Sequence, residues 1–319
     1  MLNVMLIGLG KIGMLNDYDH SNSAPIETLA NAFSQCPSCN LVSAVDPDQE
    51  KRGLFQEKYN TKSFSTISEA ANFKNPDIAI IATPTNSHAE LFESLLENCK
   101  PQLVLCEKPL SFTRKDGLKI KQLSQKLNVP VVVNYMRRTD SSILKVKNLI
   151  ESGEIRGSFK GVGWYSKGIF NNGSHLIDIF QFIFGEIKEC KAISKPMLMR
   201  DNGDLDIDIF IRFNDAEFYL LATNEVYFSN FSFTIHCNNG TLSYNNKTIS
   251  WSNRSSLTPI ESNILDSFIF NTDSPILYLN VANDVCNFVN KKEFSLTSLN
   301  SAYQIVDLLE GLKESIYAN

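Results

Sequence analysis

Two side chains stand at positions where they could move a proton or stabilise a charge during a reaction. His175 lies in the stretch GIFNNGSHLIDIF (Gly168–Phe180), four residues after Asn171, and the apolar spacing that follows predicts a buried helix. Lys108 follows the apolar run LVLCE, which predicts the end of a buried strand. An imidazole can act as a general base near neutral pH, although a histidine at the start of a helix can also simply satisfy backbone groups.

The N-terminus carries the clearest ligand-binding pattern. The strand-like run VMLIG leads directly into GLGKIG, in which Gly8, Gly10 and Gly13 form a complete GxGxxG around Lys11 and Ile12. Such glycines allow a tight turn, the approach of a pyrophosphate and close helix packing, while the helix N-terminus offers free N–H groups. We therefore predict a dinucleotide site here; the alternative is a purely structural glycine turn.

Asp46 ends the second predicted strand, where an acidic side chain would accept hydrogen bonds from both ribose hydroxyls. A carboxylate would repel a 2′-phosphate, which favours NAD over NADP, although Asp46 could instead serve a turn with Pro47. The spacing is unusual, because 33 positions (46 − 13) separate Gly13 from Asp46, where roughly 20 are usual. The polar, helix-breaking segment Met14–Pro25 accounts for the excess, and we predict an extra loop at the ligand-binding edge of the sheet.

The first 136 residues alternate short apolar runs with helical patterns, which predicts a parallel sheet covered on both faces. The predicted strands are 4–8, 41–46, 77–84, 103–109 and 129–135. From residue 137 the pattern changes: helical stretches are followed, from about residue 188 to 294, by alternating strands typical of a largely antiparallel sheet. A helix at about 297–317 ends the chain. We therefore predict two domains, 1–136 and 137–319, of α/β and α+β type.

Composition narrows the classes of function. The chain has 319 residues, 43% of them hydrophobic and 20% charged, as in a globular protein of two domains. A net charge of −5 without a basic run argues against a nucleic-acid partner. No apolar run is long enough to span a membrane and no leader is evident, so we predict a cytoplasmic protein.

Seven cysteines are compatible with reduced thiols rather than a disulfide framework. Cys36 and Cys39 form one CxxC beside Pro37. A zinc site would need two further ligands at similar spacing, and the sequence shows none, so we predict an incidental loop and no metal.

These motifs together resemble the Gfo/Idh/MocA family, named for glucose–fructose oxidoreductase, inositol dehydrogenase and a rhizopine-catabolism protein. The matching stretches are GLGKIG, AVDPD, IIATPTNSH, CEKP, NYMRR, NNGSHLID and the terminal LTSLNSAYQIVDLLEGLKES, which together cover nearly the whole chain. The resemblance implies an N-terminal Rossmann domain and a C-terminal domain with a large open, mostly antiparallel sheet. It also implies NAD(P)-linked oxidation or reduction of a sugar, polyol or nucleotide sugar, and a homodimer or homotetramer formed through that sheet.

The resemblance also implies roles for the two chemical side chains. Lys108 would contact the nicotinamide ribose and the reacting oxygen, where it would stabilise alkoxide charge. His175 would face the substrate hydroxyl and take its proton. The family often has Asp-x-Gly-x-His where this chain has Asn171-Asn172-Gly173-Ser174-His175; Asn171 can orient an imidazole but brings no negative charge.

The resemblance also implies further cofactor- and substrate-binding residues, but the motifs around them are less specific. Thr83, Pro84, Asn86 and His88 follow the third predicted strand, where the family contacts cofactor; His88 could equally be structural. Glu107 either supports the fold or holds Lys108. Of the two arginines in NYMRR, Arg137 is the candidate substrate-binding residue, with surface ion pairing as the alternative, and Asp178 either faces the site or follows helix polarity.

Two functions from different classes remain. The first is an NAD-dependent dehydrogenase or reductase acting on a CH–OH group of a carbohydrate-like substrate, favoured by Lys108 and His175. The second is a non-catalytic dinucleotide-binding regulator of the same fold, which the asparagine at position 171 keeps open. The sequence does not identify the substrate.

Overall fold

The computed structural model describes residues 1–20, 24–200, 203–254 and 264–317. It divides into two compact units, Met1–Thr139 with Pro275–Asp307 and Asp140–Ser274 with Leu308–Asn319. A single boundary after residue 136 had been predicted, whereas here the chain returns to the first unit after residue 274. The returning segment contains helix α8 (Leu277–Val289), and buried residues of this helix join the first unit's core. Strands were predicted here and that prediction is wrong, because the apolar residues recur at helical spacing.

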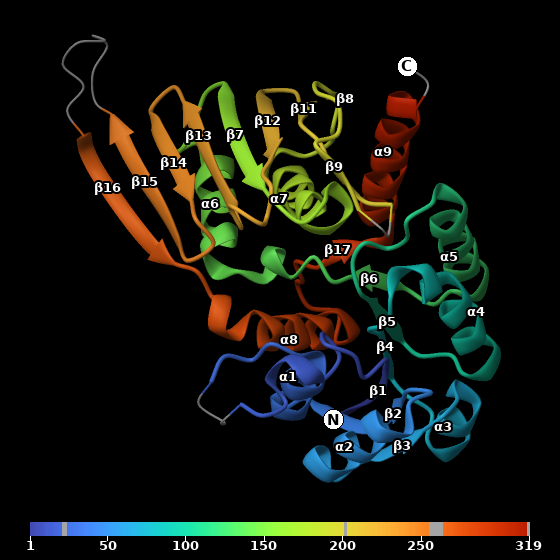
Figure 1. Ribbon diagram of the computed structural model, residues 1–319. Helices are drawn as coiled ribbons and strands as arrows, with labels where there is room; N and C mark the ends of the chain where they lie inside the picture. The colour runs from blue at the N-terminus through green and yellow to red at the C-terminus, as the bar shows by residue number, and fades with distance from the viewer. Residues whose placement is uncertain (21–23, 201–202, 255–263, 318–319) are drawn as a thin grey trace. The chain divides into compact units, whose positions relative to one another are not determined.

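The first unit contains, among its described residues, a seven-stranded sheet with the order β17-β6-β5-β4-β1-β2-β3 (Figure 1). Strands β1 to β6 are parallel and β17 runs antiparallel to β6. This is the doubly wound order, with its switch point between β1 and β4. The predicted parallel Rossmann sheet is confirmed, and only the short strands β3 and β17 were missed. The bounds are β1 Leu2–Ile7, β2 Cys39–Val45, β3 Lys62–Phe64, β4 Ile78–Ile81, β5 Leu103–Cys106, β6 Val131–Val133 and β17 Thr297–Ser298.

Helices connect these strands, and side-chain caps set several of their starts. The Thr66 hydroxyl and the Glu69 carboxylate form a reciprocal capping box at α3, and Asp48 caps α2 by accepting the N–H groups of Glu50 and Lys51. Within this unit α1 lies beside α8, and α4 beside α5 (Figure 1). The bounds are α1 Leu29–Gln35, α2 Gln49–Tyr59, α3 Ile67–Phe73, α4 His88–Asn98 and α5 Arg114–Leu127.

The glycine motif is followed by one turn of helix. The chain then leaves this helix and continues it at a later residue. The Met14 N–H donates to the Gly10 carbonyl at 2.8 Å, but the chain then leaves the helix. It returns at α1, where the Leu29 and Ala30 N–H groups donate to the carbonyls of Ile12 (3.0 Å) and Gly13 (2.9 Å). In an uninterrupted helix residues 16 and 17 would make these two bonds.

The interruption therefore contains 13 residues (29 − 16), and removing them from the 33 positions between Gly13 and Asp46 restores the usual spacing of roughly 20. The predicted loop Met14–Pro25 overlaps it from residue 16 to residue 25, and residues 21–23 are outside the described part. Its described start is held by buried Asp17, whose carboxylate accepts from the Thr28 hydroxyl at 2.6 Å and the Asn31 amide at 2.8 Å.

The second unit contains, in its described residues, an eight-stranded sheet with the order β16-β15-β14-β13-β7-β12-β11-β8. Neighbouring strands are antiparallel except β7 and β12, so the predicted, mostly antiparallel sheet is confirmed. Helices α6 and α7 cover one face (Figure 1), and Phe180 of α7 stacks on Phe218 of β12 with ring centroids 4.2 Å apart. The bounds are α6 Ser141–Glu151, β7 Phe159–Tyr165, α7 Ser174–Phe184, β8 Glu189–Ala192, β11 Ile209–Arg212, β12 Ala216–Ala222, β13 Phe231–Cys237, β14 Gly240–Tyr244, β15 Thr248–Arg254 and β16 Ile264–Asn271.

Strand β7 lies in the middle of this sheet but was not predicted, because Gly161 and Gly163 lower its strand propensity. The structure explains why glycine is present. A Cβ at Gly163 would lie 2.6 Å from Leu220 Cδ2 and 3.2 Å from Leu176 Cδ1 of α7. The glycine thus permits close approach of helix and sheet. The final helix, α9, spans Leu299–Tyr317, and the division between the two units falls within it.

Candidate functional site

A cavity of about 700 Å³ lies in the first unit at the carboxyl ends of β1, β2 and β4. Its position is the switch point of the doubly wound sheet, where open α/β sheets bind their ligands. Five of the predicted cofactor-binding residues line it: Gly8, Gly10, Asp46, Thr83 and Pro84. The other predicted positions, which are all described, are not among its lining residues: Lys11, Ile12, Gly13, Asn86, His88, Glu107 and Lys108.

The three glycines of the motif differ in what excludes a side chain. Gly8 has φ +100°, and a Cβ there would lie 2.7 Å from the Ala82 carbonyl oxygen. A Cβ at Gly13 would lie 2.1 Å from the Gly8 carbonyl oxygen. A Cβ at Gly10, in contrast, would meet nothing within 4 Å. Gly8 and Gly13 are therefore required by the protein's own packing, whereas Gly10 leaves open space beside the cavity, as close approach of a pyrophosphate requires.

Asp46 holds the glycine turn from the neighbouring strand. Its carboxylate accepts the Leu9 N–H at 2.8 Å through Oδ2 and the Asp48 N–H at 2.9 Å through Oδ1, and the residue is 6% exposed. A carboxylate has about four acceptor positions, so two bonds leave capacity for ribose hydroxyls. Asp46 thus combines the turn-forming contact to Asp48 with a place on the cavity wall.

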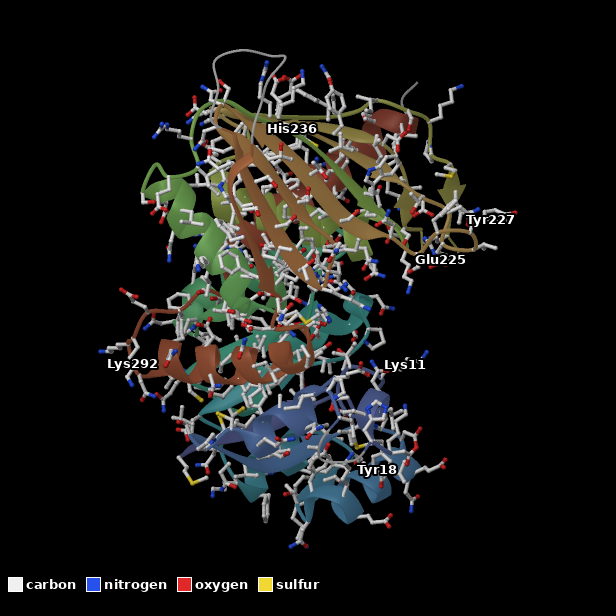
Figure 2. All side chains as sticks on the ribbon, turned by 90° about the vertical axis from the view of Figure 1, so that its left-hand side faces the viewer. Lys11, Tyr18, Glu225, Tyr227, His236 and Lys292 are labelled. Carbon is white, nitrogen blue, oxygen red and sulfur yellow. The ribbon has the colours of Figure 1, made fainter. Side chains whose placement is uncertain are left out.

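Two residues inside the glycine motif have different surroundings. Lys11 is exposed, and its side chain points outward from the N-terminal segment (Figure 2). Ile12 is partly buried and packs against the core of the first unit.

His88 begins α4 but its ring is buried, with 1% exposure. Its Nε2 lies 3.0 Å from the Thr83 carbonyl oxygen and its Nδ1 lies 3.1 Å from that of Leu110. Burial lowers the pKa of His88, although the two carbonyls oppose that shift. The ring joins the loops that follow β4 and β5, and this geometry favours the structural alternative for His88. Asn86, two residues earlier, is exposed in a short 3-10 turn.

Glu107 and Lys108 lie directly after β5. Glu107 is buried, accepts the Asn134 side-chain amide at 2.6 Å and accepts the Lys108 backbone N–H at 3.2 Å. Burial raises the pKa of Glu107, and the amide hydrogen bond opposes the shift. Glu107 therefore fixes the backbone at Lys108, whose side chain is half-buried. After β6, Arg137 is half-buried whereas Arg138 is only 7% exposed, so Arg137 is the more accessible arginine.

The segment around His175 belongs to the second unit and is helical from an earlier residue than predicted. Residues Ile169–Gly173 form a π-helical turn that continues into α7, so His175 lies inside a continuous helical segment rather than at its start. His175 is 4% exposed, and its ring meets Phe231 edge-on with centroids 6.3 Å apart. Asn171 is half-buried and lies one helical turn before it.

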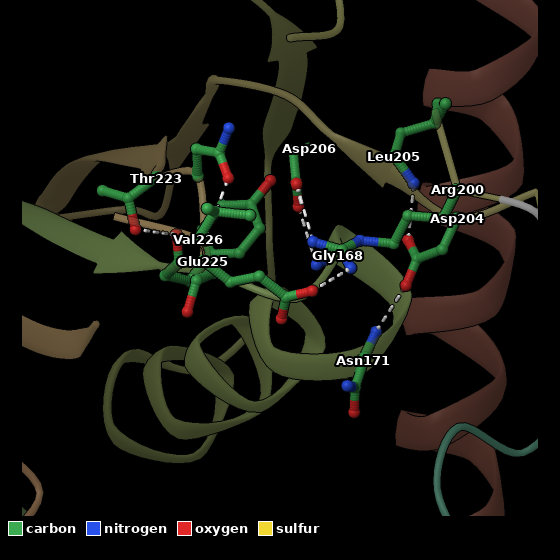
Figure 3. Close-up of polar contacts among 12 residues, drawn as sticks. Gly168, Asn171, Arg200, Asp204, Leu205, Asp206, Thr223, Glu225 and Val226 are labelled. Atoms are coloured by element: carbon green, nitrogen blue, oxygen red, sulfur yellow. Dashed lines mark hydrogen bonds and ion pairs between the residues drawn. The ribbon is translucent and has the colours of Figure 1, made fainter. Parts of the chain in front are cut away.

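An aspartate that sequence reasoning missed holds this turn. Asp204 accepts the N–H groups of Asn171 (3.1 Å) and Leu205 (2.7 Å) (Figure 3). It also accepts the Phe170 N–H at 2.9 Å. Asp206 accepts the Gly168 N–H at 2.8 Å and pairs with Arg200 at 2.8 Å. Burial raises the pKa of Asp204, while the three N–H groups oppose this. Asp204 falls within the run of about residues 188 to 294 that predicts alternating strands, directly before LDIDIFIRF, and no motif marks it.

The side chains of Asp178 and Tyr165, two further ionisable groups of this unit, are both buried. Asp178 is completely buried in α7. Tyr165 is also buried, and its hydroxyl donates to the Ile207 carbonyl at 2.5 Å. Burial raises the pKa of Tyr165. A tyrosine held in this way is a poor candidate for proton transfer.

A doubly wound sheet with a glycine turn and a cavity at its switch point defines a dinucleotide-binding protein of the Rossmann class. The N-terminal part of the chain matches the Gfo/Idh/MocA family of oxidoreductases, as its motifs predicted. Residues 2–135 match the family model described as an oxidoreductase family with an NAD-binding Rossmann fold.

Named relatives agree with this assignment. The chain is 28% identical over 255 residues to inositol 2-dehydrogenase of Corynebacterium glutamicum (strain R), covering 71% of each chain. It is 27% identical over 225 residues to scyllo-inositol 2-dehydrogenase (NAD(+)) of Bacillus subtilis (strain 168), covering 63% of this chain and 60% of that protein. A putative NADPH-dependent oxidoreductase from Desulfitobacterium hafniense DCB-2 has the same fold, with a TM-score of 0.80, 18% identity, and 99% and 96% of the two chains covered.

Among the described residues, no helix combines the length and the hydropathy needed to cross a membrane.

Proposed function

We propose that this protein is an NAD-dependent dehydrogenase that transfers hydride between nicotinamide and a secondary alcohol or ketone of a cyclic polyol or sugar. The observation that carries the proposal is the cavity at the switch point, with open space at Gly10 and an aspartate with remaining acceptor capacity on its wall. The relatives whose names specify inositol and scyllo-inositol support a polyol as the first substrate class to test.

The residues of the first unit fit the cofactor as follows. The Gly10 backbone would allow the pyrophosphate to approach, and Asp46 would accept hydrogen bonds from the ribose hydroxyls. Thr83 and Pro84 would form the opposite wall of the cavity, after β4. When bound, the nicotinamide supplies the hydride acceptor or donor.

The choice of NAD over NADP depends on Asp46. Its carboxylate would repel a 2′-phosphate, whereas Lys51, which also lines the cavity, would attract one. The Lys51 ammonium lies 3.5 Å from the Asp48 carboxylate, which offsets part of its charge. Arg52 donates to the backbone carbonyls of Asp46 and Pro47. Because Asp46 lines the cavity and the Lys51 charge is partly offset, we expect the site to favour NAD.

Lys108 and His175 would carry the chemistry. Lys108 would stabilise the alkoxide that forms as hydride leaves, and His175 would take the hydroxyl proton. Asn171 would orient the imidazole without adding charge. Arg137 would bind a hydroxyl or an anionic group of the substrate. We further propose a homodimer or homotetramer formed through the uncovered face of the eight-stranded sheet, where Trp164 is 41% exposed.

The test is a screen of inositols, sugars and nucleotide sugars with NAD and NADP, following the absorbance of the reduced nicotinamide. We expect turnover of at least one cyclic polyol with NAD. Gly10→Ala should remain folded, bind NAD at least about 10-fold more weakly and lose most of the rate at limiting NAD.

Gly53→Ala is the matched control, because a Cβ at this exposed α2 position also meets nothing within 4 Å, yet it does not line the cavity. If no compound is turned over while NAD binds and promotes capture of a protein partner, the regulator is the correct function. If Gly10→Ala binds NAD normally, the cavity is not the cofactor site.

A further inference from the structure

Three cysteines come together at the amino end of the first unit's sheet, opposite the carboxyl ends that form the cavity. Cys36 follows α1, Cys39 begins β2 and Cys286 lies on α8. All three are buried, with exposures of 2%, 4% and 3%. The Sγ atom of Cys286 lies 3.0 Å from that of Cys39 and 3.9 Å from that of Cys36, and all three sulfurs lie within 4.8 Å of one another.

The prediction of an incidental CxxC loop without further ligands did not anticipate this cluster. Cys286 is 247 residues beyond Cys39 and stands alone in its own segment, so no local spacing connects it with the CxxC. Packing of α8 beside α1 supplies the third thiol.

The spacing of the sulfurs fits one thiophilic metal ion. In a tetrahedral zinc site with Zn–S distances of about 2.3 Å, the sulfur atoms lie about 3.8 Å apart. The observed separations, from 3.0 Å to less than 4.8 Å, bracket that value. Rotation of the thiol side chains that changes these separations by up to about 1 Å would place all three sulfurs about 3.8 Å from one another.

The two CxxC thiols are presented by a fixed turn. The Cys39 N–H donates to the Cys36 carbonyl at 3.0 Å, and Pro37 occupies the second position of the turn, where its φ is already set. The Ser38 carbonyl accepts the Leu2 N–H at 2.8 Å, which attaches the turn to β1. The turn therefore holds two sulfurs on the same side before any ion arrives.

A fourth ligand position is available on the solvent side. The Asn283 Oδ1 atom lies 3.5 Å from the Cys36 sulfur, and Asn283 precedes Cys286 by three residues on α8. Asn283 is exposed, so water can also reach this point. An amide oxygen or a water would complete a tetrahedron with three thiolates.

The thiols already share hydrogen bonds, because the Cys286 sulfur lies 3.0 Å from that of Cys39 and 3.9 Å from that of Cys36, and either sulfur of each pair can donate. A metal cation would replace these shared hydrogens and would stabilise all three sulfurs as thiolates. A disulfide, in contrast, would use two of the three sulfurs and leave the third buried beside it.

We propose that Cys36, Cys39 and Cys286 bind one Zn²⁺ ion, with the Asn283 amide oxygen or a water as the fourth ligand. The three thiols release their protons to solvent as three Zn–S bonds form, and no electron is transferred. The ion attaches α8 to the start of β2 and so anchors the segment that returns to the first unit after residue 274. This site is independent of the proposed dehydrogenase activity.

The test measures zinc in the full-length protein, purified anaerobically with a thiol reductant, loaded with ZnCl₂ and dialysed. We expect about one zinc per chain by elemental analysis, and less than about a tenth of that in Cys286→Ser and in Cys39→Ser. Cys99→Ser is the matched control, because Cys99 is buried in the same unit and donates to the Leu95 carbonyl but is not part of the cluster. Zinc should raise the Tm of the wild type by roughly 5 °C and leave that of Cys286→Ser unchanged.

A second measurement on the wild type avoids dependence on variants that fold poorly. Metal-free protein loaded with Co²⁺ should show sulfur-to-cobalt charge-transfer absorbance, and zinc should abolish it. Failure to bind zinc or cobalt, with all three thiols alkylated in the native state, would overturn the proposal. A protein mass lower by two hydrogens, with a disulfide among these cysteines despite the reductant in the buffer, would also overturn the proposal. Binding of copper(I) without binding of zinc would overturn it as well.

Discussion

Two segments of the molecule carry the proposed function, and they are built on the same plan. The turn Gly8–Gly13 in the first unit and the turn Gly168–Gly173 in the second each begin with a glycine at positive φ, +100° and +92°. Each is also held by an aspartate that accepts backbone N–H groups, Asp46 in the first unit and Asp204 in the second. A carboxylate can thus fix irregular backbone wherever no helix or strand supplies the acceptors.

The two aspartates differ in the hydrogen-bond acceptor capacity that remains once they have accepted the backbone N–H groups. Asp46 accepts one N–H on each oxygen and lines the cavity. Asp204 accepts three N–H groups and is 2% exposed. A Cβ at Gly168 would lie 2.0 Å from the Asp204 carboxylate, so the two are packed directly together. The same residue type therefore keeps acceptor capacity at the wall of a cavity in one turn and accepts three backbone N–H groups in the other.

The largest expected effect concerns chemistry, which the proposal assigns to Lys108 and to the segment after the second turn. His175→Ala and Lys108→Ala should each lower kcat at least about 10²-fold, because a general base or an electrostatic stabiliser is lost. NAD affinity, measured by fluorescence titration, should change little for His175→Ala. Near-normal turnover of His175→Ala would show that the histidine is structural, and Tyr165 could not replace it while its hydroxyl is held by Ile207.

Removing the carboxylate of the second turn should destabilise the protein. Asp204→Ala leaves three N–H groups, two of them buried, without their acceptor, and we expect the free energy of unfolding to fall by about 2–3 kcal/mol. Urea denaturation measures this, with Asp215→Ala, an aspartate in the exposed turn before β12, as the control. An unchanged urea midpoint would mean that water replaces the carboxylate as acceptor. The second turn would then not depend on its aspartate.

The corresponding change in the first turn should affect the ligand more than the fold. Asp46→Ala removes the acceptor for the ribose hydroxyls and the repulsion of a 2′-phosphate, so NAD should bind about 10-fold more weakly and NADP more tightly than before. Titration of both cofactors measures the change. If NAD affinity and preference stay the same, Asp46 serves only the turn, as Asp204 does.

The smallest expected effect tests the asparagine at the second turn. Asn171→Asp places a carboxylate one helical turn before His175, where it favours the charged imidazole. More of the histidine is then protonated at a given pH, so the base-limited limb of the kcat profile should move to higher pH by up to about one unit. Asn172→Asp, one position further on, is the control. A profile that does not move would mean that the residue at 171 does not act on His175.

The parallel sheet, the glycine turn, the place of Asp46 and the terminal helix followed from the sequence, because each is encoded in consecutive residues whose periodicity or order is itself the signal. Strand β7 was missed because its glycines serve packing against α7, and α8 was missed because its apolar spacing lay within a run of strands. Local patterns could not identify Asp204, which is 33 residues from the turn it holds, or Cys286, which is 247 residues from Cys39.

Even the excess spacing before Asp46 became interpretable only when the hydrogen bonds from Leu29 and Ala30 showed a helix resumed after an insertion. A sequence determines the elements that short-range periodicity encodes, whereas the acceptor that satisfies a distant N–H group and the thiol that completes a cluster are decided when those elements pack.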